Sequence, residues 1–171
     1  MRSMVRKTLQ LVMLGCLVAS GFGVMTLATP SPVSATDARN YKADSQECRL
    51  LAMINKERAR KNEPKLQLSA SLGAASEHHS GDMAKRKKMY HSDLRKNAEQ
   101  HGYNEGSLGE NVGFGDAKAK PMLNAWMDSA GHRRNILDGG FRAIGIAREK
   151  GGNQWYWTTI FGSETDQTVR C

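Results

Sequence analysis

The N-terminal apolar run limits what this chain can fold into more than any other sequence feature. Three basic residues within the first seven positions precede a mostly apolar stretch from Leu9 to about Leu27. A charged end followed by an apolar run is the pattern of a secretory signal peptide. Such a run does not fold as part of a soluble core, so the folded domain must be formed by the residues that follow it.

A cleavage site follows this run. Val33 and Ala35 supply the small side chains that signal peptidase accepts at its third-last and last positions, which places the cut before Thr36. We therefore predict a signal peptide over residues 1–35 and a secreted, extracellular mature protein. Two alternatives stay open. About twenty apolar residues can span a bilayer as an uncleaved anchor, and Leu14-Gly15-Cys16 resembles a lipoprotein box, although the apolar run continues past it.

The net charge of the mature chain limits the classes of binding partner that we expect. Removing residues 1–35 leaves 22 Lys and Arg against 17 Asp and Glu, a net charge of about +5 over about 136 residues. This length fits one domain, which we expect to be monomeric. The mild, dispersed surplus is that of an ordinary soluble protein, with an anionic cell-envelope component as the alternative partner. Nucleic acid is not expected as a partner of an exported chain.

Two cysteines remain after Cys16 leaves with the signal peptide. An even pair in an oxidising compartment favours a disulfide, so we predict a bond between Cys48 and Cys171. This bond would tie the first long helix to the last residue of the sequence.

The sequence predicts an α+β domain over residues 47–171, preceded by a flexible polar tether at residues 36–46. Apolar residues at helical spacing predict four helices, the second capped by Ser69. Two aromatic and β-branched runs around Lys150-Gly151-Gly152-Asn153 predict an antiparallel hairpin. The expected helices cover residues 46–61, 69–87, 94–101 and 118–129, and the expected strands cover residues 141–148 and 154–161.

Eight short motifs follow one another between Leu50 and Gly162. They are Leu51-x-x-x-Asn55-x-x-Arg58, Ala75-x-x-x-His79-Ser80-x-Asp82-Met83-Ala84, His91-Ser92, Gly102-Tyr103, Gly109-Glu110-Asn111-Val112, Trp126-x-x-Ser129-x-Gly131-His132-Arg133-x-Asn135-Ile136-Leu137, Ile144-Gly145-Ile146-Ala147 and Trp157-x-x-x-Phe161-Gly162. Together they resemble bacterial members of the CAP superfamily of cysteine-rich secretory, antigen-five and pathogenesis-related (SCP-like) proteins. The resemblance implies a three-layer α-β-α sandwich with a small antiparallel sheet.

The resemblance also implies a binding cleft that contains His91, Glu110 and His132. Two neutral imidazoles suit Zn²⁺ or a similar cation, and a nearby carboxylate can orient a histidine. We therefore expect His91 and His132 to hold a weakly bound divalent metal such as zinc. Asp128 lies close in sequence to the position where family members often carry a second glutamate, and we include it in the cleft. The alternative is that these side chains only hydrogen-bond the cleft together.

The predicted function is that of a secreted CAP-domain binding module for a small lipid, glycan, peptide or divalent cation. The alternative is a metal-dependent extracellular hydrolase or protease, in which a metal-bound water would replace a side-chain nucleophile. Neither a Gly-x-Ser-x-Gly elbow nor a His-Glu-x-x-His motif occurs in the sequence, so no catalytic residue is predicted. His79, on the apolar face of its helix, is predicted to be a packed residue rather than a ligand.

Overall fold

A five-stranded sheet lies at the centre of the part of the chain that the computed structural model describes, residues 35–171, with side chains described from Ala38 onward. The strands run in the order β2-β4-β3-β1-β5. Their bounds are Gln67–Ser69 (β1), Leu108–Gly115 (β2), Ala143–Gly151 (β3), Gln154–Gly162 (β4) and Thr168–Val169 (β5). The predicted signal peptide, apart from Ala35, lies outside the described residues.

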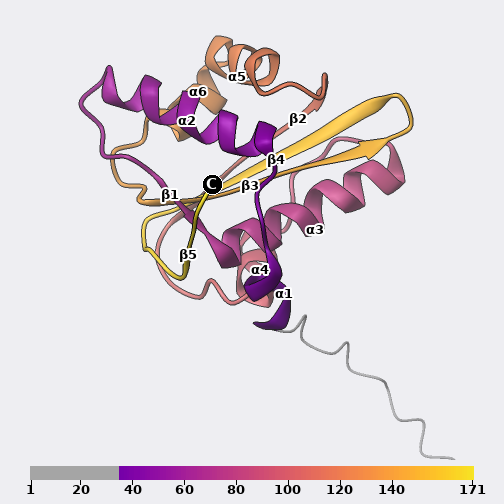
Figure 1. Cartoon of the computed structure of the whole chain (residues 1–171), viewed down its shortest axis with the longest axis horizontal. Helices are drawn as coiled ribbons and strands as arrows, with labels where there is room; N and C mark the ends of the chain where they lie inside the picture. The colour runs from indigo at the N-terminus through magenta and orange to yellow at the C-terminus, as the bar shows by residue number, and fades with distance from the viewer. Residues whose placement is uncertain (1–34) are drawn as a thin grey trace, which may run out of the picture. The chain divides into compact units, whose positions relative to one another are not determined.

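Helices cover both faces of this sheet (Figure 1). One face carries α1 (Ala35–Asn40), α3 (Ala70–Arg86) and α4 (Leu94–Gln100), and the other carries α2 (Ser45–Ala59), α5 (Ala119–Asp128) and α6 (Ala130–Leu137). The predicted three-layer α-β-α sandwich is therefore confirmed. Among the described residues, no helix combines the length and the apolar character needed to span a bilayer.

The predicted hairpin forms the middle of the sheet. Strand β3 pairs antiparallel with β4 up to Gly151 and Gln154, and Gly152 takes the positive φ that the turn needs. Strand β2 adds to β4, also antiparallel. The short strand β1 pairs parallel with β3, which makes the sheet mixed rather than purely antiparallel as the sequence suggested.

The segment predicted to be a flexible tether, residues 36–46, is instead structured. It contains α1 and the first turn of α2, and the Tyr41 side chain is 3% exposed. The Tyr41 hydroxyl donates a 2.6 Å hydrogen bond to the Ile146 carbonyl, and its ring lies against Gly73, where a β-carbon would collide with it. The polar residues around Tyr41 gave no indication that its ring would be buried, so the prediction of a flexible tether is wrong.

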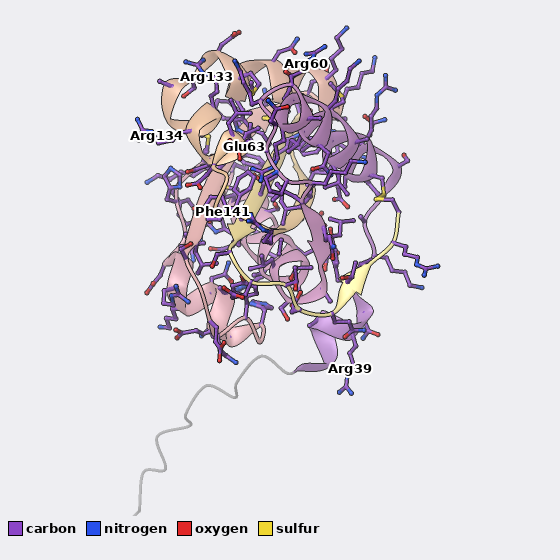
Figure 2. All side chains as sticks on the ribbon, turned by 90° about the vertical axis from the view of Figure 1, so that its left-hand side faces the viewer. Arg39, Arg60, Glu63, Arg133, Arg134 and Phe141 are labelled. Carbon is purple, nitrogen blue, oxygen red and sulfur yellow. A yellow bond between two sulfur atoms is a disulfide. The ribbon has the colours of Figure 1, made fainter. Side chains whose placement is uncertain are left out.

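Two smaller predictions are confirmed. Cys48 and Cys171 form a disulfide that joins α2 to the last residue of the sequence. Ser69 caps α3 by accepting a hydrogen bond from the Leu72 amide. Figure 2 shows the exposed side chains of Arg60, Arg133 and Arg134 projecting from the end formed by α2 and α6.

Candidate functional site

Glu110 is the buried centre of the candidate site. It lies on β2, an edge strand of the sheet, and it is 7% exposed. Its carboxylate accepts hydrogen bonds from His91 Nδ1 at 2.8 Å, from the Ser92 amide at 3.0 Å and from Ser92 Oγ at 2.6 Å. These three donors offset the cost of burying the negative charge.

The contact with Glu110 fixes the orientation of His91. The imidazole side chain is 63% exposed while the carboxylate that holds it is 3% exposed. A carboxylate can only accept, so Nδ1 carries the proton in the neutral ring and Nε2 presents a lone pair. His91 is therefore held in place by a buried acid through Nδ1, and the lone pair of its Nε2 is available to a ligand.

Asn111, the residue after Glu110 on β2, holds the segment that carries His132. Successive side chains of a strand point to opposite faces, so Asn111 faces the layer of α5 and α6. Asn111 Nδ2 donates to the His132 carbonyl at 3.1 Å. Asn135 Nδ2 donates both to the Glu110 carbonyl at 3.1 Å and to Asn111 Oδ1 at 2.9 Å. Two adjacent residues of one edge strand thus position both histidines, one from each helical layer.

His132 has an unsatisfied polar atom. Its Nδ1 is buried and has no hydrogen-bond partner among the described residues. Burial, together with the nearby His91, holds the pKa of His132 below its ordinary value. The ring is therefore neutral at pH 7, and an unpartnered nitrogen of this kind is a place where a ligand group would be favourable.

An apolar groove lies beside His132. Met89 and Phe114, the large apolar side chains that are exposed in the described region, are 43% and 54% exposed, and both line this groove. We call it the β2-edge groove. Its volume is about 230 Å³, and its lining consists of Met89, Val112, Gly113, Phe114, Met122, Ala125, Trp126, Ser129 and His132.

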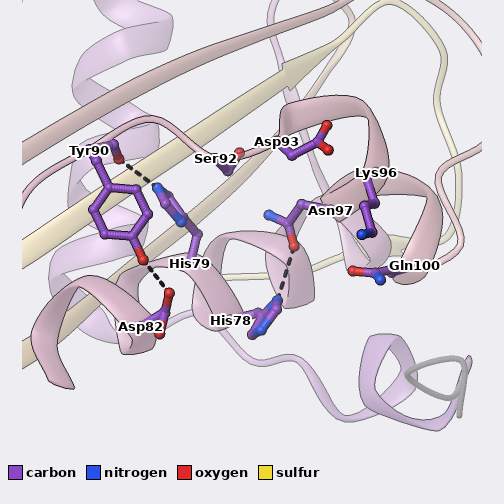
Figure 3. Close-up of a pocket in the computed structure, with 9 residues that line it drawn as sticks. All are labelled: His78, His79, Asp82, Tyr90, Ser92, Asp93, Lys96, Asn97 and Gln100. Atoms are coloured by element: carbon purple, nitrogen blue, oxygen red, sulfur yellow. Dashed lines mark hydrogen bonds between the residues drawn. The ribbon is translucent and has the colours of Figure 1, made fainter. Parts of the chain in front are cut away.

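A second hollow is lined by residues of α3, of α4 and of the loop between them, among them His79, Tyr90 and Ser92 (Figure 3). His79 Nε2 donates there to the Tyr90 carbonyl at 2.8 Å and lies 3.9 Å from Glu110 Oε2. Tyr90 in turn donates to Asp82. Because His79 is 5% exposed and hydrogen-bonded, the prediction that it is a packed residue is confirmed.

Asp128 does not join the other predicted cleft residues. It is exposed at the end of α5 and makes no hydrogen bond or ion pair with His91, Glu110 or His132 within the described part of the chain. Over residues 35–171, no three His, Cys, Asp or Glu side chains are grouped so that they could hold a metal ion. The Glu110 carboxylate already accepts three hydrogen bonds, so the ring nitrogens of His91 and His132 are what this site would offer a metal first.

Two positioning residues were missed at the sequence level. Ser92 and Asn111 each lie in a motif together with a predicted site residue, but their sequence spacing says nothing about which carbonyl or carboxylate they contact. The signal that could have identified Ser92 and Asn111 is their position directly after His91 and Glu110.

Comparison with known proteins agrees with this architecture. The model of the cysteine-rich secretory protein family, CAP, matches residues 51–161. The Bacillus subtilis (strain 168) protein YkwD is 26% identical over 136 residues, which cover 75% of this chain and 52% of that protein. The chain thus spans about half the length of this relative.

Solved structures show the same fold. An outer surface protein from Borrelia burgdorferi superimposes with a TM-score of 0.64 at 18% identity, covering 72% of this chain and 98% of that chain. An extracellular protein containing an SCP domain from Bacillus anthracis gives a TM-score of 0.60 at 23% identity, covering 68% and 39% of the two chains. At these identities the likeness establishes the fold alone.

Proposed function

Because this chain belongs to the cysteine-rich secretory protein (CAP) family, we propose that it is an extracellular binding protein whose ligand is a small amphipathic molecule held at the β2 edge. The observation that carries the proposal is His132 at the wall of the apolar groove, with a buried ring nitrogen that has no partner among the described residues. A ligand that fills the groove and hydrogen-bonds this nitrogen would satisfy it.

The groove sets the size of the apolar part of the ligand. An apolar cavity of about 150 Å³ is large enough to hold benzene, so a groove of about 230 Å³ suits one ring or a short acyl chain. Trp126 and Met122 offer polarisable surface for such a group. This lining favours a lipid-like or aromatic ligand over a glycan, which needs several polar partners.

The protonation state of His132 determines which polar group of a ligand it can bind. A neutral imidazole has one N–H donor and one acceptor nitrogen, so it forms a hydrogen bond with an uncharged amide or hydroxyl group without either partner being ionised. Since the pKa of His132 is lowered, binding should be constant through neutral pH and weaken only under acidic conditions, as the ring becomes protonated.

A divalent cation is the competing ligand, bound by His91 and His132. Two neutral nitrogens with no third protein ligand among the described residues make a weak and open site. When bound, such an ion would supply Lewis-acid chemistry, which is the basis of the hydrolase alternative. His91 would offer Nε2 and His132 would offer a ring nitrogen, while Glu110 would orient His91 without contacting the ion.

Calorimetric titration with phenylacetamide tests the proposal, because this probe joins one ring to one neutral amide. Acetamide, which lacks the ring, and zinc chloride are titrated in parallel. Ala125→Phe fills the groove, and Asn124→Phe adds the same ring to the adjacent exposed position of α5, which does not line the groove.

We expect phenylacetamide to bind, Ala125→Phe to abolish that binding and Asn124→Phe to preserve it. If zinc chloride gives a heat of binding and phenylacetamide does not, and if that heat is lost in His91→Ala, the ligand of this site is a cation and the proposal of an amphipathic ligand is wrong. Equal effects of the two phenylalanine variants would contradict binding in the groove.

A further inference from the structure

A basic and apolar edge adjoins the β2-edge groove on the surface of the domain. Four consecutive basic residues, Lys85 to Lys88, end α3 and continue directly into the exposed Met89. All four are exposed, as is Lys150 close to the turn of the β3–β4 hairpin. A hollow lies between the helix end and the hairpin, and its charged lining consists of Lys85, Lys87 and Lys150 together with one acid, Glu149.

Packing fixes this edge to the exposed aromatic ring of Phe114. Phe114 stacks on Tyr156, with ring centroids 6.3 Å apart, and Tyr156 packs with Met83 and Ala84 in one buried cluster. Because Lys85 directly follows Ala84, the basic run begins at the cluster that supports Phe114. The Lys88 amide donates to the Met83 carbonyl at 3.1 Å, which keeps the run close to the helix end.

Most of this charge has no acidic partner. Arg86 is paired with Asp82 at 2.9 Å, but Lys85, Lys87, Lys88 and Lys150 form no ion pair within residues 35–171. A favourable interaction with the helix dipole accounts for basic residues in the last turn of α3. It does not account for Lys88 and Lys150, which lie outside the helix, nor for the two exposed apolar side chains beside them.

We propose that this edge docks on an anionic phospholipid bilayer. Lysines gathered around exposed Met and Phe side chains match the anionic headgroups and the acyl boundary of such a surface. Unpaired lysines are long and flexible, so they can follow headgroups that move laterally. A soluble polyanion would use the same lysines but would not bury the exposed apolar surface of Met89 and Phe114.

Vesicle binding tests this docking surface. The exported protein is mixed with vesicles of phosphatidylcholine alone, or of phosphatidylcholine with phosphatidylglycerol, at low ionic strength. Lys85→Gln/Lys88→Gln removes two charges from the edge. The matched control, Lys56→Gln/Lys61→Gln, removes two exposed lysines at the C-terminal end of α2, in the layer on the opposite face of the sheet (Figure 1). All variants keep the same N-terminus, so any contribution from residues 1–35 is common to them.

We expect binding only to the vesicles that contain phosphatidylglycerol. The edge variant should bind about 30-fold more weakly, since each basic residue near an anionic surface contributes roughly fivefold to binding. The control variant should stay within about twofold of the wild type. In a Met89→Trp variant, brominated acyl chains should quench the added fluorescence.

Three results would overturn the docking proposal. The protein could fail to bind anionic vesicles, the two double variants could weaken binding equally, or binding could occur without quenching in Met89→Trp. The last result would indicate contact with charge alone. None of these measurements includes phenylacetamide, so their failure is independent of the proposed ligand site.

Discussion

Arg58 shows how a single polar side chain can stabilise an apolar core. It is fully buried, and its guanidinium donates to carbonyls of four separate residues, Pro64, Ile136, Asp138 and Phe141. These carbonyls belong to the loop after α2, to the end of α6 and to the segment before β3. A rigid five-donor fork suits this task better than an ammonium group.

Arg58→Lys should therefore be destabilising although it keeps the positive charge. One lysine nitrogen cannot reach carbonyls on three segments, and each carbonyl left buried without a partner costs about 1 kcal/mol or more. We expect the free energy of unfolding to fall by about 2–3 kcal/mol, measured by urea denaturation with the disulfide intact. The exposed Arg134→Lys should change it by less than about 0.5 kcal/mol. An equal, small change in both variants would show that the carbonyls are satisfied without Arg58.

At the scale of elements, the N-terminus of α2 contains a buried acid that titrates near neutrality. Glu47 is 5% exposed and accepts hydrogen bonds from the Asp44 amide at 2.7 Å and the Arg148 amide at 3.0 Å. Burial nevertheless raises the pKa of Glu47 from 4.5 to about 7. The folded protein thus binds a proton more tightly than the unfolded chain does.

Because the pKa of Glu47 is raised in the folded protein, the free energy of unfolding should decrease as the pH rises. The contribution of Glu47 is complete below pH 4.5 and is lost as the pH rises to about 7. Relative to Glu47→Gln, the wild type should lose on the order of 3 kcal/mol of unfolding free energy over that range. Parallel denaturation series at several pH values measure the difference. Parallel curves for the two proteins would mean that the carboxyl group titrates normally.

Close packing of α3 on β3 gives a second element-scale prediction. A β-carbon on Gly145 would collide with the Leu72 carbonyl group and the Gly73 amide, which belong to the helix backbone. Gly145→Ala should therefore cost about 3 kcal/mol or more. Gly81 lies on the same helix with open space around it, so Gly81→Ala should add about 0.5–1 kcal/mol. Thermal unfolding of both variants checks this contrast, and similar melting temperatures would contradict it.

Elements with strong local signals were predictable from sequence, and those formed by tertiary contacts were not. The hairpin and α3 carry turn and cap residues that act locally. Strand β1 and α1 are short, and they exist because β3 and α3 lie next to them. In the candidate site, the residue types at His91, Glu110 and His132 pointed to a cleft. The groove beside them is formed by Met89, β2 and α5, whose proximity no sequence spacing reveals.

At the scale of the whole molecule, the disulfide joins the two ends of a loop that contains almost the entire domain. Cys48 and Cys171 are 123 residues apart, so the bond restricts a long loop in the unfolded chain. Replacing both by serine should lower the free energy of unfolding by about 3–4 kcal/mol without changing the fold. Urea denaturation and thiol titration of the native protein test this. Two reactive thiols in the wild type would show that the bond is absent in solution.

The proposal that the β2 edge binds an amphipathic ligand is tested most directly at the His132 ring. Nitrogen NMR of histidine-labelled protein reports the protonation and hydrogen bonding of each imidazole nitrogen. On addition of phenylacetamide at pH 7, the His132 Nδ1 resonance should shift in proportion to occupancy. The resonances of His79, which already donates to the Tyr90 carbonyl, should stay constant. Saturating phenylacetamide that leaves His132 Nδ1 unchanged would contradict ligand binding at this nitrogen.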